Sequence, residues 1–353
     1  MLDRSVVETI VIPEAPAIFG LIFRGFRGET DYANILAVIE GSKEADQVER
    51  SDSLEDVTRY YSHLNNCDPT KDMLFIEVDN KVVGYTRVEW FVNSDGEWLG
   101  FNLAFLLPEW RRKGLGRVML RFNERRLREI AAEQIEDGTL AADVHRYFET
   151  YVDDGETGKQ ALFHAEGYEA VRYGFDMRRS LSDPVEVTPL PEGIEVRPAQ
   201  PEHTRAIWEA AEEAFLDHWN SVPQTETDYQ RFLTDPTFDP NLWKVGWEGD
   251  QVAGSVLNFV NANENEEYNR NRGYTEGISV RRPWRKRGLA TALITRSLKM
   301  FQEMGMTEAA LAVDAQNLSG ALRLYESAGF RQVKQSATYR KELDIVADAQ
   351  EQQ

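Results

Sequence analysis

The 353-residue sequence is poor in residues that bind metals or form disulfides. Its one cysteine, Cys67, excludes an intrachain disulfide and a zinc knuckle, and it favours a reducing, cytoplasmic compartment. The five histidines lack the paired spacing typical of metal ligands: His63, His145, His164, His203 and His218. We therefore expect no metal.

Long apolar runs and an excess of positive charge are also absent. No apolar run approaches the roughly 20 residues that span a bilayer, and residues 1–20 lack the basic start and apolar block of a signal peptide. The formal net charge of -20 argues against nucleic acid as a partner and would favour a cationic acceptor such as an amine. The length allows two domains of ordinary size.

The most informative stretch runs from Thr275 to Phe330. A predicted strand ends at Val280, a basic loop (Arg285-Lys286-Arg287-Gly288) follows, and an amphipathic helix then continues to Gly305. A helix N-terminus presents backbone N–H groups without internal partners, and Gly288 lets an anion approach them. This order of elements predicts a diphosphate site.

Two further elements complete the unit. The apolar run 309–313 predicts a covered strand, and Asn317 is a candidate cap for a helix ending at Gly329. The unit therefore reads strand, phosphate loop, helix, strand, helix.

The same unit occurs earlier in the chain. The segment Trp110–Gly116 returns as Trp284–Ala290, 174 residues later. Between the copies, residues 184–192 are rich in proline and predict a linker. We assign 1–183 to an N-terminal domain, 193–346 to a C-terminal domain and 347–353 to a frayed tail. Other predicted elements are strands at 20–28, 99–107 and 193–197, helices within 31–65 and 201–215, and hairpins at 73–90 and 242–260.

At this point the residues resemble a known family. Arg285-x-x-Gly288-x-Ala290, followed by Asn317-x-x-x-Ala321-x-x-Leu324-Tyr325-x-x-x-Gly329-Phe330, is similar to the acetyl-CoA-binding core of the GNAT N-acetyltransferases. The resemblance implies two tandem α/β domains, each a mostly antiparallel, splayed sheet flanked by helices, an arrangement also seen in mycothiol synthase. It also implies contacts to acetyl-CoA from Ile278, Ser279, Val280, Arg285, Lys286, Arg287, Gly288, Leu289, Ala290, Thr291 and Asn317, with a second phosphate loop at Arg111, Arg112, Lys113, Gly114, Leu115 and Gly116.

The resemblance assigns catalytic roles in the C-terminal copy. Glu276 stands four residues before Val280, which predicts that both side chains share one face of the strand, and it matches the family's general base. Tyr325 matches the general acid that protonates the coenzyme A thiolate. The first copy has Asn102 and Phe163 at these positions, so we interpret it as a degenerate partner that keeps the phosphate loop.

The acceptor side is less distinctive. In this family the acceptor meets the segment after the first helix and the strand that carries the base, which here points to Asp217, His218, Trp219 and Tyr274. The alternatives are that Trp219 and His218 close a domain interface, that Glu276 is a solvated edge carboxylate and that Tyr325 belongs to the core.

The leading hypothesis is a cytoplasmic enzyme, monomeric or homodimeric, that moves the acetyl group of acetyl-CoA directly to a primary amine of a small molecule. The sequence does not identify the acceptor, and it does not distinguish an acetyl donor from a longer acyl donor. The rival hypothesis is a non-catalytic protein that senses coenzyme A or a metabolite. Retention of Glu276 and Tyr325 argues against the rival, because a sensor needs only the phosphate loop.

Overall fold

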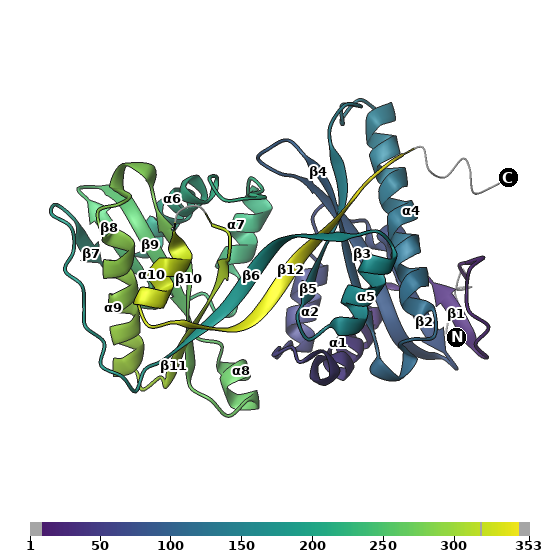
Figure 1. The fold of residues 1–353 in the computed structure, drawn as a ribbon, viewed down its shortest axis with the longest axis horizontal. Coiled ribbons are helices and arrows are strands. Elements are labelled where there is room, and N and C mark those ends of the chain that lie inside the picture. Colours follow the sequence, from purple (N-terminus) through teal and green to yellow (C-terminus); the bar gives the residue numbers. More distant parts are fainter. Residues whose placement is uncertain (1–8, 318–319, 346–353) are drawn as a thin grey trace. The chain divides into compact units, whose positions relative to one another are not determined.

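The computed structural model describes residues 9–317 and 320–345. The predicted tail, 347–353, lies outside them. The chain forms two compact units: unit 1 contains the residues up to Val171 and those from Ala337 onward, and unit 2 contains Arg172–Ser336. Figure 1 shows the elements in sequence colours.

Unit 1 is built mainly from the first half of the chain. Its elements are β1 (Leu21–Arg24), α1 (Tyr32–Asp46), α2 (Leu54–Tyr61), α3 (Pro69–Asp72), β2 (Met73–Val78), β3 (Lys81–Val92), β4 (Trp98–Leu106), α4 (Leu115–Glu136), β5 (Arg146–Asp153) and α5 (Thr157–Ala165), after which β6 (Glu169–Ser180) begins.

Unit 2 repeats this order. Its elements are β7 (Glu195–Arg197), α6 (Thr204–Phe215), α7 (Glu226–Leu233), β8 (Lys244–Glu248), β9 (Gln251–Phe259), α8 (Ala262–Glu267), β10 (Arg272–Val280), α9 (Leu289–Glu303), β11 (Glu308–Asp314) and α10 (Ala321–Ser327), followed by β12 (Arg331–Glu342).

The two copies exchange their last strands. In unit 2 the strand order is β6-β11-β10-β9-β8-β7, and β6 pairs antiparallel with β11, with Asp176 opposite Ala312. In unit 1 the order β1-β2-β3-β4-β5 is followed by β12, whose residues from Ala337 onward belong to that unit. The predicted boundary at 184–192 follows the sequence repeat, whereas the compact units follow the exchanged strands.

The predicted fold class is confirmed: each unit is a mixed, mostly antiparallel sheet flanked by helices. The hairpin β2–β3 turns through Asp79 and Asn80, both with positive φ, as their side chains permit. In unit 2 the hairpin β8–β9 turns at Gly249–Asp250. Within the described ranges, no helix combines the length and apolar character that a membrane span requires.

Separate apolar cores cover the two faces of the sheet in unit 2. One contains Leu293, Leu298 and Phe301 of α9 together with Tyr325 of α10. The other contains Ile207 of α6 and strand residues that include Val245 and Val252. The helix α6 and the pair α9 and α10 therefore pack against opposite faces of this sheet.

Candidate active site

Strands β10 and β11 separate in the middle of the unit 2 sheet. Their parallel pairing runs from Arg272 opposite Glu308 to Tyr274 opposite Ala310, and no pairing follows. On its other edge, β10 has a bulge against β9 between Glu276 and Ser279. Gly277 makes this bulge possible, because its φ is 55° and an added Cβ would lie 3.0 Å from the Leu257 side chain.

The bulge corrects one sequence prediction. An added Cβ at Gly273 would contact the ring of Phe301 on α9, so Tyr274 and Glu276 point to the opposite face. Beyond the extra residue of the bulge, Val280 packs against the core beside α9. Glu276 and Val280 therefore face opposite sides of the sheet, and the prediction that they share a face is wrong.

Glu276 lies where the two strands separate. Its carboxylate Oε1 accepts a 2.9 Å hydrogen bond from the backbone N–H of Ala312 on β11. Burial raises the pKa of Glu276 to about 7, the Ala312 hydrogen bond opposes this change, and the negative charge of Asp176 adds to it. A carboxyl with a pKa near neutrality can accept a proton and release it again at physiological pH.

Tyr325 approaches the same region from the other face. It lies on α10 within the core beside α9, and only 7% of its surface is exposed. Burial, and then the charge of Glu276, raise the pKa of Tyr325, so its phenol keeps its proton at neutral pH. The structure thus brings Glu276 and Tyr325 within electrostatic range of each other.

The predicted phosphate loop has the expected backbone. Lys286 (φ 60°) and Gly288 (φ 86°) adopt left-handed conformations, and α9 begins at Leu289 without a side-chain cap. The first N–H groups of α9 have no acceptor within the helix, so this turn offers donors to an anion. The remaining residues predicted to bind the cofactor, Ile278, Ser279, Val280, Ala290 and Thr291, lie at the end of β10 and in the first turn of α9.

The arginine at the start of each loop makes contacts within the protein that the sequence analysis did not predict. Arg285 donates to the carbonyl of Val280 (2.9 Å) and to the carboxylate of Asp217 (2.6 Å). In unit 1, Arg111 donates in the same way to Leu106 (2.9 Å) and Asp46 (2.8 Å). Each arginine therefore connects the end of its strand to an acidic residue at or just after the first long helix of its unit.

The other basic residues of the unit 2 loop also differ in their contacts. Arg287 donates to the Glu192 carbonyl (2.8 Å) and pairs with Glu248 (3.3 Å). Lys286 is exposed, and it has no ion-pair partner among the residues described. Of the predicted basic triplet, Lys286 is therefore the side chain best placed to meet a phosphate. Contacts of these residues with acetyl-CoA stay predictions.

The helix that carries Tyr325 starts later than predicted. α10 begins at Ala321, and its N-cap is Gly320 (φ 80°) without a side-chain hydrogen bond. Asn317 therefore does not cap it, and residues 318–319 between them lie outside the described part of the chain. The backbone N–H of Asn317 donates to the carbonyl of Asp314 (3.2 Å), which places this residue in the turn that follows β11.

The four residues predicted to meet the acceptor are all in unit 2, with distinct contacts. Arg282 and Arg285 hold the Asp217 carboxylate, which lowers its pKa. Trp219 lies under the guanidinium of Arg172 (5.1 Å), and burial lowers the pKa of His218. Tyr274 donates to Glu264 and stacks on Phe259 (4.8 Å). A contact of any of the four with an acceptor stays a prediction.

Unit 1 contains a cleft at the position of its own phosphate loop. It has a volume of about 540 Å³, and its lining includes Gly114, Gly116, Thr150 and Phe163. Gly114 (φ 89°) and Arg112 (φ 61°) repeat the backbone of the unit 2 loop. The loop at this cleft therefore has the same backbone conformation as the loop of unit 2 at these two positions.

In unit 1 the position of Tyr325 is occupied by Phe163, which cannot titrate. Strand β4 pairs with β3 without a bulge, so Asn102 lies on the face of α4, and Leu103 rather than Asn102 matches the position of Glu276. The predicted match of Asn102 to the base is therefore wrong.

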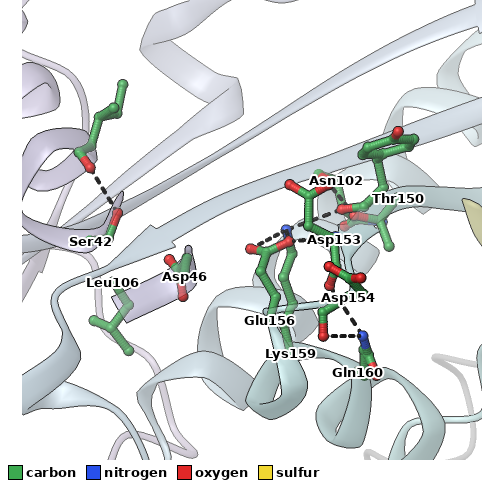
Figure 2. A network of polar contacts seen from close by, with 12 residues as sticks. Ser42, Asp46, Asn102, Leu106, Thr150, Asp153, Asp154, Glu156, Lys159 and Gln160 are labelled. Atoms are coloured by element: carbon green, nitrogen blue, oxygen red, sulfur yellow. Dashed lines mark hydrogen bonds and ion pairs between the residues drawn. The ribbon is translucent and has the colours of Figure 1, made fainter. Parts of the chain in front are cut away.

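Asn102 accepts through its backbone carbonyl from the Thr150 hydroxyl (3.0 Å), and its side-chain amide donates to Tyr168 (3.3 Å). Phe163 packs edge-on against Tyr168 (4.9 Å). Figure 2 shows Asn102 and Thr150 beside Glu156 and Lys159, which lie at the start of α5. The two positions of unit 1 that match Glu276 and Tyr325 therefore carry no titratable side chain.

Comparison with known proteins identifies the family. A model described as the acetyltransferase (GNAT) family matches residues 37–147 and 204–330. The chain belongs to the GNAT acetyltransferase family. As a GNAT protein it is an acetyl-CoA-dependent N-acetyltransferase, and the sensing alternative receives no support from these matches.

Curated GNAT relatives extend over most of the chain. The mycothiol acetyltransferase of Geodermatophilus obscurus is 28% identical over 276 residues, which cover 77% of this chain and 82% of the relative. That of Streptomyces scabiei is 28% identical over 274 residues, which cover 76% of this chain and 79% of the relative.

Solved GNAT structures share the two-unit fold. A GCN5-related N-acetyltransferase from Sphaerobacter thermophilus is 27% identical with a TM-score of 0.67, covering 92% of this chain and 96% of that one. A tandem GNAT protein from the clavulanic acid biosynthesis pathway is 15% identical with a TM-score of 0.61, and the match covers 92% of this chain and 99% of that one. At this identity the match shows similarity of fold alone. In the described part of this chain, no group of three or more His, Cys, Asp or Glu residues is placed to hold a metal ion.

Proposed function

We propose that unit 2 transfers the acetyl group to a primary amine of a small molecule, with Glu276 as general base and Tyr325 as general acid. The observation that carries this proposal is the placement of the two groups. A carboxyl with a pKa of about 7 and a protonated phenol approach from opposite faces the point where β10 and β11 separate.

The geometry suggests how the steps follow one another. The ammonium of the acceptor gives a proton to Glu276, and the freed nitrogen lone pair forms a bond to the thioester carbonyl carbon. Collapse of the intermediate breaks the carbon–sulfur bond, and the thiolate takes the proton of Tyr325. The phenolate recovers a proton from the former amine nitrogen, and Glu276 releases its proton to water, so that one proton is released overall.

The oxyanion of the intermediate needs backbone donors. The bulge interrupts the pairing between β9 and β10 at Gly277 and Ile278, and the backbone N–H groups at this interruption are our candidates. The separated strands would hold the thioester between the two faces, and the α9 N-terminus would hold the diphosphate. The names of the curated relatives suggest an acceptor of the mycothiol type.

The decisive experiment measures thiol release from acetyl-CoA with a panel of amines, including an amino sugar, a polyamine and an aminoglycoside. Glu276→Gln and Tyr325→Phe are each expected to slow turnover roughly 100- to 10,000-fold, since each removes one proton-transfer group. Tyr339→Phe is the matched control, because Tyr339 is as buried as Tyr325 but lies in unit 1. Calorimetry should show that all three variants still bind acetyl-CoA. Undiminished turnover in both site variants would refute the assignment.

We further propose that unit 1 holds coenzyme A without turning it over. The cleft and the repeated loop backbone support binding, and Leu103 and Phe163 at the positions of Glu276 and Tyr325 argue against catalysis. Calorimetry on the whole chain should then give two acetyl-CoA sites. Gly116→Asp places a carboxylate in the unit 1 loop and should reduce the stoichiometry to one while turnover continues. One site in the unaltered protein would contradict this part of the proposal.

A further inference from the structure

The exchanged strand β6 brings a second carboxylate to the face of unit 2 that carries Glu276. Asp176 lies opposite Ala312, whose backbone N–H donates to Glu276. Its neighbours Phe175 and Met177 pack into the core beside α9, so Asp176 points to the other face. It is exposed on that face, which Glu276 shares.

The same face of β6 also meets the segment that follows α6. Arg172, four residues before Asp176, pairs with Asp314 at the end of β11 through two hydrogen bonds of 2.9 and 2.6 Å. Its guanidinium lies 5.1 Å from the ring of Trp219. An acceptor that enters beside Trp219 would therefore reach Glu276 along a wall formed by β6.

We propose that Asp176 is a specificity residue of the acceptor site, which receives the positive charge of the incoming ammonium beside Glu276. This inference rests on the proposed function of unit 2. Arg172 on this face is already paired with Asp314, and Arg178 adds one positive charge. The ionised carboxylates of Glu276 and Asp176 therefore leave the face net negative, which attracts an ammonium and repels an anion. The substrate class is therefore a primary amine without a negative group next to the amino carbon, such as an amino sugar, a polyamine or an amino-acid amide, rather than a free α-amino acid.

The charge of Asp176 also acts on the base. Asp176 of β6 lies on the same face as Glu276, Tyr325 of α10 approaches from the opposite face, and β11 contributes the Ala312 N–H and β9 the apolar Leu257. Charged groups that share the Glu276 face on β6 and β11 include Arg178 and the ion pair of Arg172 with Asp314. The negative charge of Asp176 favours the protonated form of Glu276. Removing that charge should therefore lower the pKa of Glu276 and extend activity to lower pH.

The test uses the full chain and two matched probes, glycinamide and glycine, which differ by one carboxylate next to the same amine. We expect the unaltered enzyme to acetylate glycinamide and to discriminate against glycine. Asp176→Asn should raise KM for glycinamide about tenfold, because one charged contact is lost. The preference of the enzyme for glycinamide over glycine should also become smaller. KM for acetyl-CoA should not change. Glu169→Gln is the control, because it removes the same charge from an exposed position on β6 in unit 1.

A second measurement does not depend on turnover. Carbon-13 NMR of glutamate-labelled protein, with the Glu276 signal assigned by its loss in Glu276→Gln, should show a lower pKa for Glu276 in Asp176→Asn. An unchanged titration, or an unchanged KM for glycinamide, would overturn the role of Asp176. If Glu276→Gln were as active as the unaltered enzyme, the proposed function would fail instead, and the NMR titration would still decide whether the charge of Asp176 acts on Glu276.

Discussion

Replacing Glu276 by glutamine should make the protein more stable at alkaline pH while it removes activity. The pKa of this carboxyl is raised from its ordinary value of 4.5 to about 7 in the folded chain. Below pH 4.5 the carboxyl is protonated in the folded and unfolded chains alike, so folding loses nothing. Between pH 4.5 and 7 the unfolded chain ionises first, and stability falls as pH rises.

The magnitude follows from the pKa difference. At about 1.4 kcal/mol for each pKa unit, the ionised carboxylate costs the folded state about 3 kcal/mol above pH 7. Glutamine carries no charge, and its side-chain oxygen can still accept the hydrogen bond from Ala312. We compare the free energy of unfolding of the variant with that of the unaltered protein. This difference, variant minus unaltered, should be about 2 to 3 kcal/mol larger at pH 8.5 than at pH 5.

Urea denaturation at the two pH values measures this difference, with circular dichroism as the signal. The control is again Glu169→Gln, in which an equal charge is removed from an exposed site. If the difference in free energy of unfolding between Glu276→Gln and the unaltered protein does not change with pH, the Glu276 carboxyl is not desolvated in the folded chain. That result would remove the main physical support for its role as a base.

Two further predictions concern the strands. Gly277→Ala should destabilise unit 2 by about 1–3 kcal/mol and lower turnover, because φ of 55° strains an alanine and its Cβ would press on Leu257. Thermal unfolding and thiol release measure the two effects, and unaltered values in both assays would contradict the prediction. Deleting residues 337–353 should destabilise unit 1 by about 3–6 kcal/mol, because Tyr339 and Leu343 are removed from its core. The fluorescence of buried Trp98 reports the urea midpoint, and an unchanged midpoint would contradict this prediction.

Much of the local structure could be predicted because it depends on residues close together in the sequence. The hairpin at 73–90 and the helix that begins directly after Gly288 are properties of short segments, and the structure confirms both. The repeat of Trp110–Gly116 at Trp284–Ala290 similarly predicted two copies of one fold, which the family match confirms. The acid and base positions were predicted from the motif, and their catalytic roles stay proposals.

Contacts between distant residues could not be predicted in this way. The hydrogen bond from Arg285 to Asp217 depends on where α6 ends relative to β10, which no local pattern contains. The bulge at Gly277 reversed the face of Glu276 because its effect depends on pairing with β9. The pKa of Glu276 likewise depends on burial among β10, β11 and β6.

The sequence by itself determined the elements, the repeat and the types of group available for acid and base chemistry, because these depend on side-chain identity and spacing. Only the tertiary structure decided that β6, from the first copy, completes the sheet of unit 2 and places Asp176 on the face of Glu276. Strand exchange joins segments far apart in the chain, and its outcome is set by which sheet edge buries their apolar faces.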